Sequence, residues 1–390
     1  MQTNSTYRAQ FLAPYDWYRS MRETRPVAYD EQGHCWHVMR YDDVMRVLTD
    51  YTIFSSDERT TGWEPENELP ILSSIIRIDP PRHRQLRSLA TLAFTPRVVA
   101  QMESRIKAIT EELLDQVPTG DTFDVIHDLA YPLPVTVIAE LLGVPAEHRE
   151  DFKRWSDAVV TIDVAPAEEE RHNYFNDIRN MYDYFTEVLA ERRQRPKDDL
   201  ISALIAAEVD GQHLSDTELL GFCALLLIAG NETTTNLIGN SVLCFDEYPE
   251  TVERLRKQPE LIPSAIEEVL RYLSPVKAMT RFTKTETTLG GQTIGAGEVV
   301  LAWMASANRD EAQFPDANRF DIQRTPNRHL GFGHGIHFCL GAPLARLEAR
   351  VALAAMLERF PGQWRVPDVP LQAAQSFIVF GVKQLPMTWG

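Results

Sequence analysis

Apolar residues recur at helical spacing along most of the chain, with short stretches of alternating polar and apolar residues between them. Helical patterns cover residues 14–22, 98–117, 133–160 and the run after Pro343. The longest pattern begins at Ser215, a suitable N-cap, and reaches Phe245, a span of roughly 45 Å at the helical rise per residue. Short strands are predicted at residues 27–30, 34–39, 276–281, 288–294 and 298–303. The pattern therefore predicts a mainly α fold with small β-sheets (α+β).

The chain shows no internal repeat, low-complexity segment or compositional boundary, so we expect a single domain, residues 1–390. Two segments depart from the helical pattern. Residues 58–77 combine prolines and threonines with several apolar residues, so this loop either packs down or covers a ligand. Residues 163–172 are acidic and interrupted by proline, which predicts a connection between two helices.

Composition excludes several classes of protein. A formal charge of −17 argues against a nucleic-acid-binding surface. The four cysteines are scattered without paired spacing, which favours a reducing, cytoplasmic compartment over a disulfide framework. The polar N-terminus has no apolar signal-peptide core, and the longest apolar run, Leu219 to Gly230, is too short to span a bilayer. We therefore expect no membrane anchor.

The chain's clearest chemical feature is a glycine-rich segment that ends in Cys339. Gly331, Gly333 and Gly335 precede the cysteine, and Pro343 opens a helical pattern after it. This order predicts a tight loop, here called the cysteine loop (residues 331–341), just before a helix N-terminus. The positive end of the helix and its free N–H groups would stabilise a thiolate, the form that binds a soft metal.

Three simpler interpretations of the cysteine loop compete with this one. A lone buried cysteine after a glycine-rich turn is usually structural. A dinucleotide-binding loop requires a third glycine at position 336, where this chain has Ile336. A zinc site built from His334, His337 and Cys339 lacks an evident fourth ligand at metal spacing.

The run Phe332-Gly-His-Gly-Ile-His-Phe-Cys339-Leu-Gly341 resembles the haem-binding loop of cytochromes P450 of the soluble bacterial type. The resemblance implies the P450 fold, with haem b held between a long central helix and the helix that follows the cysteine loop. It implies Cys339 as the thiolate ligand of the iron, which favours cleavage of the O–O bond. Phe332, Gly333 and Gly341 would contact the cofactor.

Inside the long helix, Ala229-Gly-Asn-Glu-Thr-Thr-Thr235 breaks the rules of helix composition. The run resembles the oxygen-binding groove of P450s. By that resemblance Ala229 lies against the cofactor, Thr233 is the hydroxyl beside bound O2, and Glu232 is the acid of the proton relay. The alternative is a kinked core helix with a solvated glutamate.

Two further motifs strengthen the resemblance. Asp79-Pro-Pro-x-His83-x-x-x-Arg87 resembles the helix that binds the haem propionates, and Arg281 and His337 match the remaining propionate ligands. Glu268 and Arg271 match the family's Glu-x-x-Arg pair, with Arg319 completing a buried network. These last three residues are interpreted as structural.

The resemblance also indicates which residues line the substrate pocket. They lie in the 58–77 loop, the long helix, the strand before Arg281 and the C-terminal turn: Leu72, Ile76, Leu225, Ala229, Val276, Lys277, Met279, Ile378 and Val379. Lys277 stands where apolar residues are usual. Its ammonium either extends to solvent or anchors an anionic substrate.

The four motifs in order imply a monooxygenase that inserts one atom of O2 into a hydrophobic molecule, resembling broad-range Bacillus-type hydroxylases of fatty acids, terpenoids and steroids. A tailoring hydroxylase of polyketides or macrolides, a peroxide-driven peroxygenase and a haem sensor or carrier are the alternatives. Electrons would come from NAD(P)H only indirectly, through a reductase and a ferredoxin or flavodoxin. We expect this partner to dock on Arg84, Arg346 and Arg350, and the protein to be a monomer.

Overall fold

The computed structural model describes residues 6–62, 69–117, 122–145, 148–161, 168–208, 211–373, 376 and 378–390. Part of the predicted 58–77 loop, most of the proline-interrupted part of 163–172, and Phe377 of the C-terminal turn therefore lie outside the described residues. The prediction of a single domain stays a prediction.

Helices make up most of the described chain. The α-helices are α1 (Thr6–Thr24), α2 (Tyr41–Thr49), α3 (Arg82–Ala93), α4 (Pro96–Gln101), α5 (Glu103–Asp115), α6 (Pro132–Leu141), α7 (Arg149–Thr161), α8 (Glu168–Gln194), α9 (Leu200–Ala206), α10 (Asp216–Glu247), α11 (Glu250–Lys257), α12 (Ile262–Tyr272), α13 (Met304–Ala307) and α14 (Ala342–Arg359). Shorter turns are η1 (Glu58–Thr61), η2 (Pro70–Ser73), the π-helical η3 (Val125–Ala130), η6 (Pro259–Leu261) and η7 (Gly335–His337).

The strands are short and form three small sheets. They are β1 (Val27–Asp30), β2 (Cys35–Val38), β3 (Phe54–Ser55), β4 (Thr122–Asp124), β5 (Met279–Thr283), β6 (Thr287–Leu289), β7 (Gln292–Ile294), β8 (Val299–Ala302), β9 (Trp364–Arg365) and β10 (Pro386–Trp389). The largest sheet has the order β1-β2-β8-β5-β3, the second β4-β10-β9, and β6 pairs with β7. The predicted mainly α fold with small sheets is confirmed.

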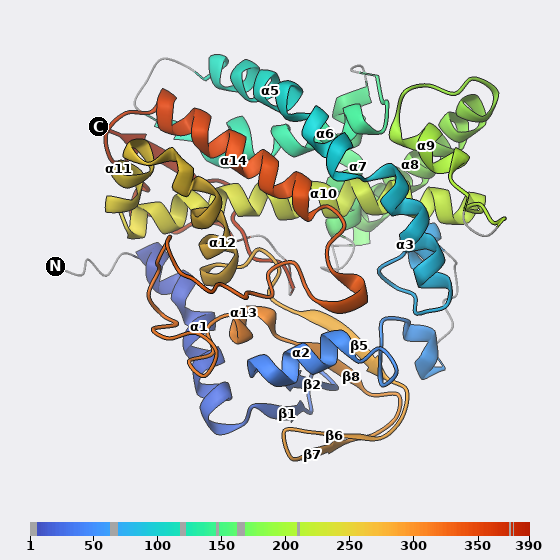
Figure 1. Ribbon diagram of the computed structural model, residues 1–390, viewed down its shortest axis with the longest axis horizontal. Coiled ribbons are helices and arrows are strands. Elements are labelled where there is room, and N and C mark those ends of the chain that lie inside the picture. The colour runs from blue at the N-terminus through green and yellow to red at the C-terminus, as the bar shows by residue number, and fades with distance from the viewer. Residues whose placement is uncertain are drawn as a thin grey trace.

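The helices and the largest sheet occupy different parts of the molecule. In Figure 1, α10 runs across the helical part with α14 crossing in front of it, and β1, β2, β5 and β8 lie at the opposite end beside α1 and α2. The cysteine loop leads into α14 from the region between these two parts. The fold therefore brings the cysteine loop between the central helix and the largest sheet.

The central helix α10 begins where the sequence predicts it. The Ser215 hydroxyl accepts a hydrogen bond from the Glu218 N–H, and the Glu218 carboxylate accepts one from the Ser215 N–H, a reciprocal cap. The helix is buried along most of its length. Glycines allow close packing against it: a Cβ at Gly221 would lie 2.3 Å from the Pro70 carbonyl oxygen, so η2 rests directly on the helix backbone.

Candidate active site

The cysteine loop takes the tight conformation that its glycines predict. Gly333 and Gly335 have φ of +69° and +71°, in the left-handed region that favours glycine. At Gly331 a Cβ would lie 2.9 Å from the Leu270 carbonyl oxygen, so the loop packs against α12. The Cys339 N–H donates to the Phe332 carbonyl at 3.0 Å, which closes the loop.

Cys339 lies just before the N-terminus of α14. Burial raises the pKa of its thiol, and the backbone N–H groups of Gly341 and Ala342 and the charge of Arg87 act in the opposite direction. A Cβ at Gly341 would lie 4.0 Å from the Cys339 sulfur, so glycine keeps this approach to the sulfur open. The predicted loop before a helix N-terminus is confirmed.

The unusual run in α10 separates into two faces. On one face, a Cβ at Gly230 would lie 2.8 Å from Ile138 of α6, and Asn231 donates to the Ser156 hydroxyl at 3.0 Å. Thr235 donates to the Ala130 carbonyl at 2.9 Å. These three departures from helix composition therefore serve packing.

The other face of α10 is accessible in a helix that is otherwise buried. Ala229 is exposed, and Leu226 and Thr233, three residues before it and four after it, are half-buried. The Thr233 hydroxyl donates to the Ala229 carbonyl at 2.7 Å, an i−4 bond. Leu225, four residues before Ala229 and predicted to line the pocket, is 8% exposed in the main core, and Leu226 beside it is half-buried.

Four basic side chains that the sequence groups together also meet in space. The rings of His83 (α3) and His337 (η7) lie 4.3 Å apart between centroids. Neither nitrogen of either ring has a hydrogen-bond partner although all four atoms are buried. Arg87 and Arg281 act electrostatically on His337, which places all four in one cationic cluster (His83, Arg87, Arg281 and His337).

The electrostatics of this cationic cluster are unfavourable in the protein alone. Burial, followed by neighbouring cations, lowers the pKa of His83 to about 4 and that of His337 to about 3. Burial likewise lowers the pKa of Arg281 to about 10. Asp79, the nearby acid, is already bound to Lys284 at 2.6 Å. The cluster therefore has the character of a site for an anionic group.

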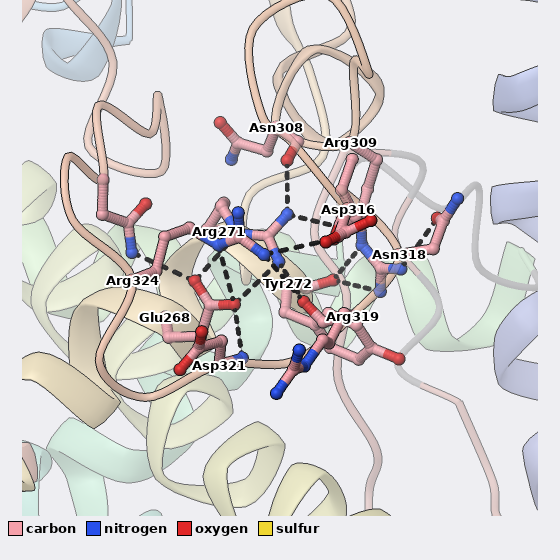
Figure 2. Close-up of polar contacts among 12 residues, drawn as sticks. Glu268, Arg271, Tyr272, Asn308, Arg309, Asp316, Asn318, Arg319, Asp321 and Arg324 are labelled. Carbon is pink, nitrogen blue, oxygen red and sulfur yellow. Dashed lines mark hydrogen bonds and ion pairs between the residues drawn. The ribbon is translucent and has the colours of Figure 1, made fainter.

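The Glu-x-x-Arg pair behaves differently, because the protein satisfies it completely (Figure 2). Arg271 donates to both carboxylate oxygens of Glu268 at 2.8 Å, and its remaining N–H groups reach the carbonyls of Asn308, Ala317 and Arg319. Both side chains are 0% exposed. Five bonds account for all five donors of the guanidinium.

Arg319 contributes to this network in a way that the sequence did not predict. Its side chain is exposed, and only its carbonyl accepts a bond from Arg271. The arginine whose side chain reaches Glu268 is Arg324, at 3.2 Å. The prediction for the Arg319 side chain was therefore wrong: the chain turns after Phe320, and this brings the Arg324 side chain over the carboxylate (Figure 2).

The predicted substrate segments converge around α10. Val276 pairs with Val379 in an isolated bridge, and the Lys277 N–H donates to the Ile378 carbonyl. The C-terminal turn reaches α10, because a Cβ at Gly381 would collide with Asn236. Leu72 in η2 and Met279 in β5 are half-buried, and Ile76 is 41% exposed.

Neither predicted role of Lys277 matches its position in full. Its ammonium donates to the Ser376 carbonyl at 3.0 Å, and burial lowers its pKa. The side chain is therefore held against the C-terminal turn and does not extend freely into solvent.

A second group of possible metal ligands, Asp30, Cys35 and His37, lies at the β1–β2 hairpin within the described residues. The Trp303 indole N–H donates to His37 Nδ1 at 2.8 Å. The neutral ring must then carry its proton on Nε2, which faces Asp30 at 3.5 Å. No lone pair of His37 is left for a metal, so this hairpin cluster is not a metal site.

Comparison with known proteins identifies the family. The family model described as cytochrome P450 matches residues 29–387. The chain is a cytochrome P450. It is 46% identical over 374 residues to a putative cytochrome P450, YjiB, of Bacillus subtilis, covering 95% of this chain and 92% of that protein. It is 44% identical over 388 residues to the erythromycin C-12 hydroxylase of Saccharopolyspora erythraea, covering 98% and 96%.

Solved structures agree with the family assignment. The structure of CYP109E1 from Bacillus megaterium in complex with testosterone superposes with a TM-score of 0.90 at 44% identity, covering 99% of this chain and all of that chain. Substrate-free CYP109E1 gives a TM-score of 0.91 at the same identity, covering 97% and 98%. The P450 is thus a monooxygenase that uses haem b and O2, with electrons from NAD(P)H delivered through redox partners.

The residues present in this P450 fit haem. One N–H group on each ring of His83 and His337, whose nitrogens have no partner among the described residues, and the guanidinium groups of Arg87 and Arg281 would provide donors for two propionates. Cys339 is half-buried and would supply a sulfur beside the backbone N–H groups of Gly341 and Ala342. Bound haem would supply the activation of O2 that no side chain provides. None of the helices in the described part of the chain has both the length and the hydropathy needed to cross a bilayer.

Proposed function

We propose that this P450 hydroxylates a hydrophobic molecule of fatty-acid, terpenoid, steroid or macrolide type, with Cys339 as the residue that would hold the haem iron through its thiolate. The observation that carries the proposal is the occurrence together of a sulfur at the α14 N-terminus and four basic side chains that form no ion pair in the described part of the chain. Ligand and propionate donors come from three distant parts of the chain, α3, β5 and the cysteine loop.

Thr233 and Glu232 would deliver protons to the oxygen side of the cofactor. The Thr233 hydroxyl already donates its proton to the Ala229 carbonyl, so its oxygen is oriented as an acceptor on the accessible face of α10. A Thr233 hydroxyl oxygen that accepts a hydrogen bond at this place would hold a water or another protonated group in position for proton transfer. Glu232, the adjacent residue, is half-buried and would supply the proton.

The pocket side chains support a hydrophobic substrate. Leu72, Leu226, Val276 and Ile378 are half-buried apolar residues on segments that meet near α10. Relatives differ in what they act on or bind: one is named an erythromycin C-12 hydroxylase, and CYP109E1 was solved with testosterone and with corticosterone. A compact polycyclic or macrocyclic substrate agrees with both.

Electron delivery would use the face of the cysteine loop. Arg84 is exposed and donates to the Tyr51 hydroxyl at 2.8 Å, whereas Arg346 and Arg350 are half-buried and paired with Glu267 and Glu103. Arg84 is therefore the strongest of the three docking candidates for an acidic ferredoxin or flavodoxin. Four unpaired cysteines agree with a reducing cytoplasm, and we propose a cytoplasmic monomer.

Two measurements test the proposal. The reduced, carbon-monoxide-bound protein should show its Soret band at about 450 nm, and Cys339→Ser should abolish that band because the thiolate is lost. A band at about 420 nm in fresh wild-type holoprotein would contradict the proposed ligand. Testosterone, a macrolide and a long-chain fatty acid should be titrated separately into the holoprotein. A compound that binds in the pocket should shift the spin state of the iron, and we expect the polycyclic or macrocyclic compounds to do so at lower concentration than the fatty acid.

Thr233→Ala tests the proposed role of the hydroxyl in proton delivery. With NADPH and a reductase system, product per NADPH should fall by about 10²-fold, since proton delivery contributes this much. Thr233→Ser keeps the hydroxyl and should retain most of the coupling. An equal yield of product per NADPH in Thr233→Ala and Thr233→Ser would show that the hydroxyl has no part in proton delivery.

A further inference from the structure

Glu267 of α12 lies next to Glu268 but takes no part in the Glu268–Arg271 network; it links α12 to α14 and to the segment that leads into the cysteine loop. The Arg346 guanidinium of α14 binds its carboxylate through two bonds, Nε to Oε1 at 2.7 Å and Nη2 to Oε2 at 2.8 Å. His329 Nε2 lies 3.0 Å from the same carboxylate. The side chain of Glu267 is thus shared between α14 and the segment that leads into the loop.

The proton position on His329 follows from its neighbours. The Gly331 N–H donates to His329 Nδ1 at 3.1 Å, so the neutral ring carries its proton on Nε2 and donates it to Glu267. The ring is 5% exposed. A continuous chain of hydrogen bonds therefore runs from α12 to the first glycine of the cysteine loop.

Arg346 makes a second contact with the loop. Its guanidinium carbon lies 4.4 Å from the centroid of the Phe332 ring. Phe332 is the residue whose carbonyl accepts the Cys339 N–H. Glu267, His329, Phe332 and Arg346, here called the loop clamp, therefore hold both the glycine turn and the carbonyl that fixes the cysteine backbone.

The charges of the loop clamp are balanced. Burial alone would raise the pKa of Glu267, but hydrogen bonds from Arg346 and His329 outweigh it and hold the pKa at about 2. Arg346 also acts on the Cys339 sulfur electrostatically. One negative and one positive charge thus lie beside the loop, and removing either leaves the other uncompensated.

We infer that Glu267 and Arg346 are positioning residues that set the electrostatic environment of Cys339, and through it the reduction potential of the haem. The inference rests on the proposed role of Cys339 as ligand. Loss of the Glu267 charge leaves Arg346 uncompensated, which favours the reduced, more negative state. Loss of the Arg346 charge leaves Glu267 uncompensated and disfavours reduction. The two substitutions should therefore shift the potential in opposite directions.

The test is an equilibrium redox titration of holoprotein with small mediators and without a partner protein. Glu267→Gln should raise, and Arg346→Gln should lower, the equilibrium constant of one-electron reduction by about three- to tenfold; tenfold corresponds to about 59 mV. The double variant should return toward wild type. Shifts in the same direction would overturn the inference, because damage to the loop would move both variants alike.

Arg350→Gln is the matched control. Arg350 lies one turn further along α14 with the same 37% side-chain exposure as Arg346, but it pairs with Glu103 of α5. Its loss should leave the potential unchanged, and a shift as large as that of Arg346→Gln would contradict a specific role for the clamp.

Carbon monoxide spectra of the same samples separate two failures. If the wild type lacks the thiolate band, the proposed ligand is wrong. If only the two glutamine variants lose the thiolate band, the loop clamp holds the cysteine loop in place without setting the reduction potential by its charges, and the inference is overturned. Should the glutamine variants not fold, Glu267→Asp and Arg346→Lys keep the charges, and their equilibrium constants of one-electron reduction should stay within about twofold of wild type; larger shifts would overturn the inference.

Discussion

Arg271 and Arg281 are buried to nearly the same degree, 0% and 3% exposed, yet the protein surrounds them in opposite ways. Every donor of Arg271 has a protein acceptor, and its charge is matched by Glu268. Arg281 has one recorded bond, to the Thr280 carbonyl, and no ion pair among the described residues. The first arrangement is complete without a ligand, whereas the second leaves a buried positive charge that the described part of the chain does not pair.

The comparison shows how a structural network and a binding site can be distinguished in a protein interior. Burial of a charge costs several kcal/mol unless it is paired, so an unpaired buried cluster is retained only where function requires it. The Glu268 network holds the segment before the cysteine loop, whereas the cationic cluster forms no ion pair among the described residues and has the character of a site for an anionic group. The predictions below follow from this difference.

The largest effect is expected at Glu268. Glu268→Ala would leave Arg271 buried and unpaired, which costs roughly 3–5 kcal/mol of folding stability. Thermal unfolding and the yield of folded protein measure the loss. If this variant unfolded within a degree of wild type in both apo and haem-loaded forms, the network would not be structural.

Arg281→Leu should affect haem affinity and leave folding stability intact, the reverse of Glu268→Ala. It removes an unpaired buried charge, so the apoprotein should be as stable as wild type or more stable. Haem affinity should fall by about 1.5–3 kcal/mol, the contribution of a charged hydrogen bond, or roughly tenfold or more. Apoprotein melting and haem transfer to a competing acceptor check the two halves. Destabilisation of the apoprotein comparable to that of Glu268→Ala would break the comparison.

Arg324 and Arg319 sharpen the comparison within the structural network. Arg324→Gln removes a side chain that reaches Glu268 and should cost about 1–2 kcal/mol. Arg319→Gln leaves the carbonyl that serves Arg271 unchanged and should stay within about 0.5 kcal/mol of wild type. Chemical denaturation of both variants measures the difference in unfolding free energy. A larger loss in Arg319→Gln than in Arg324→Gln would favour the Arg319 side chain, which the sequence predicted, as the member of the network.

The last prediction is a pH dependence of the stability of the apoprotein, set by the two histidines of the cationic cluster. Because the pKa values of His83 and His337 are lowered to about 4 and about 3, the unfolded chain binds more protons between these values and the ordinary pKa of histidine. The apoprotein should therefore lose stability as pH falls from about 6.5 toward 4. Propionates would raise both pKa values, so haem-loaded protein should lose less over this range. Melting curves of the apoprotein and the haem-loaded protein at each pH would reveal the difference. If the melting temperature changed equally with pH in both forms, this would argue against propionates at these rings.

Local sequence determined much of the site, because its constraints act over a few residues. Gly333 and Gly335 specify left-handed backbone, Pro343 specifies a helix start, and Ser215 with Glu218 specifies the start of α10. Cys339, His83 and Glu268 were recognisable because each lies in a short motif with fixed spacing. These features require no knowledge of distant contacts.

Only the tertiary structure decided which side chains meet. Arg319 and Arg324 are equally plausible in the sequence, but the path of the chain after Phe320 brings Arg324 to Glu268. Gly230 and Asn231 resemble functional residues until α6 and α7 are seen packed against them. The link from Glu267 to Arg346 crosses 79 residues. Motif spacing carries no information on such contacts, because long-range packing sets them.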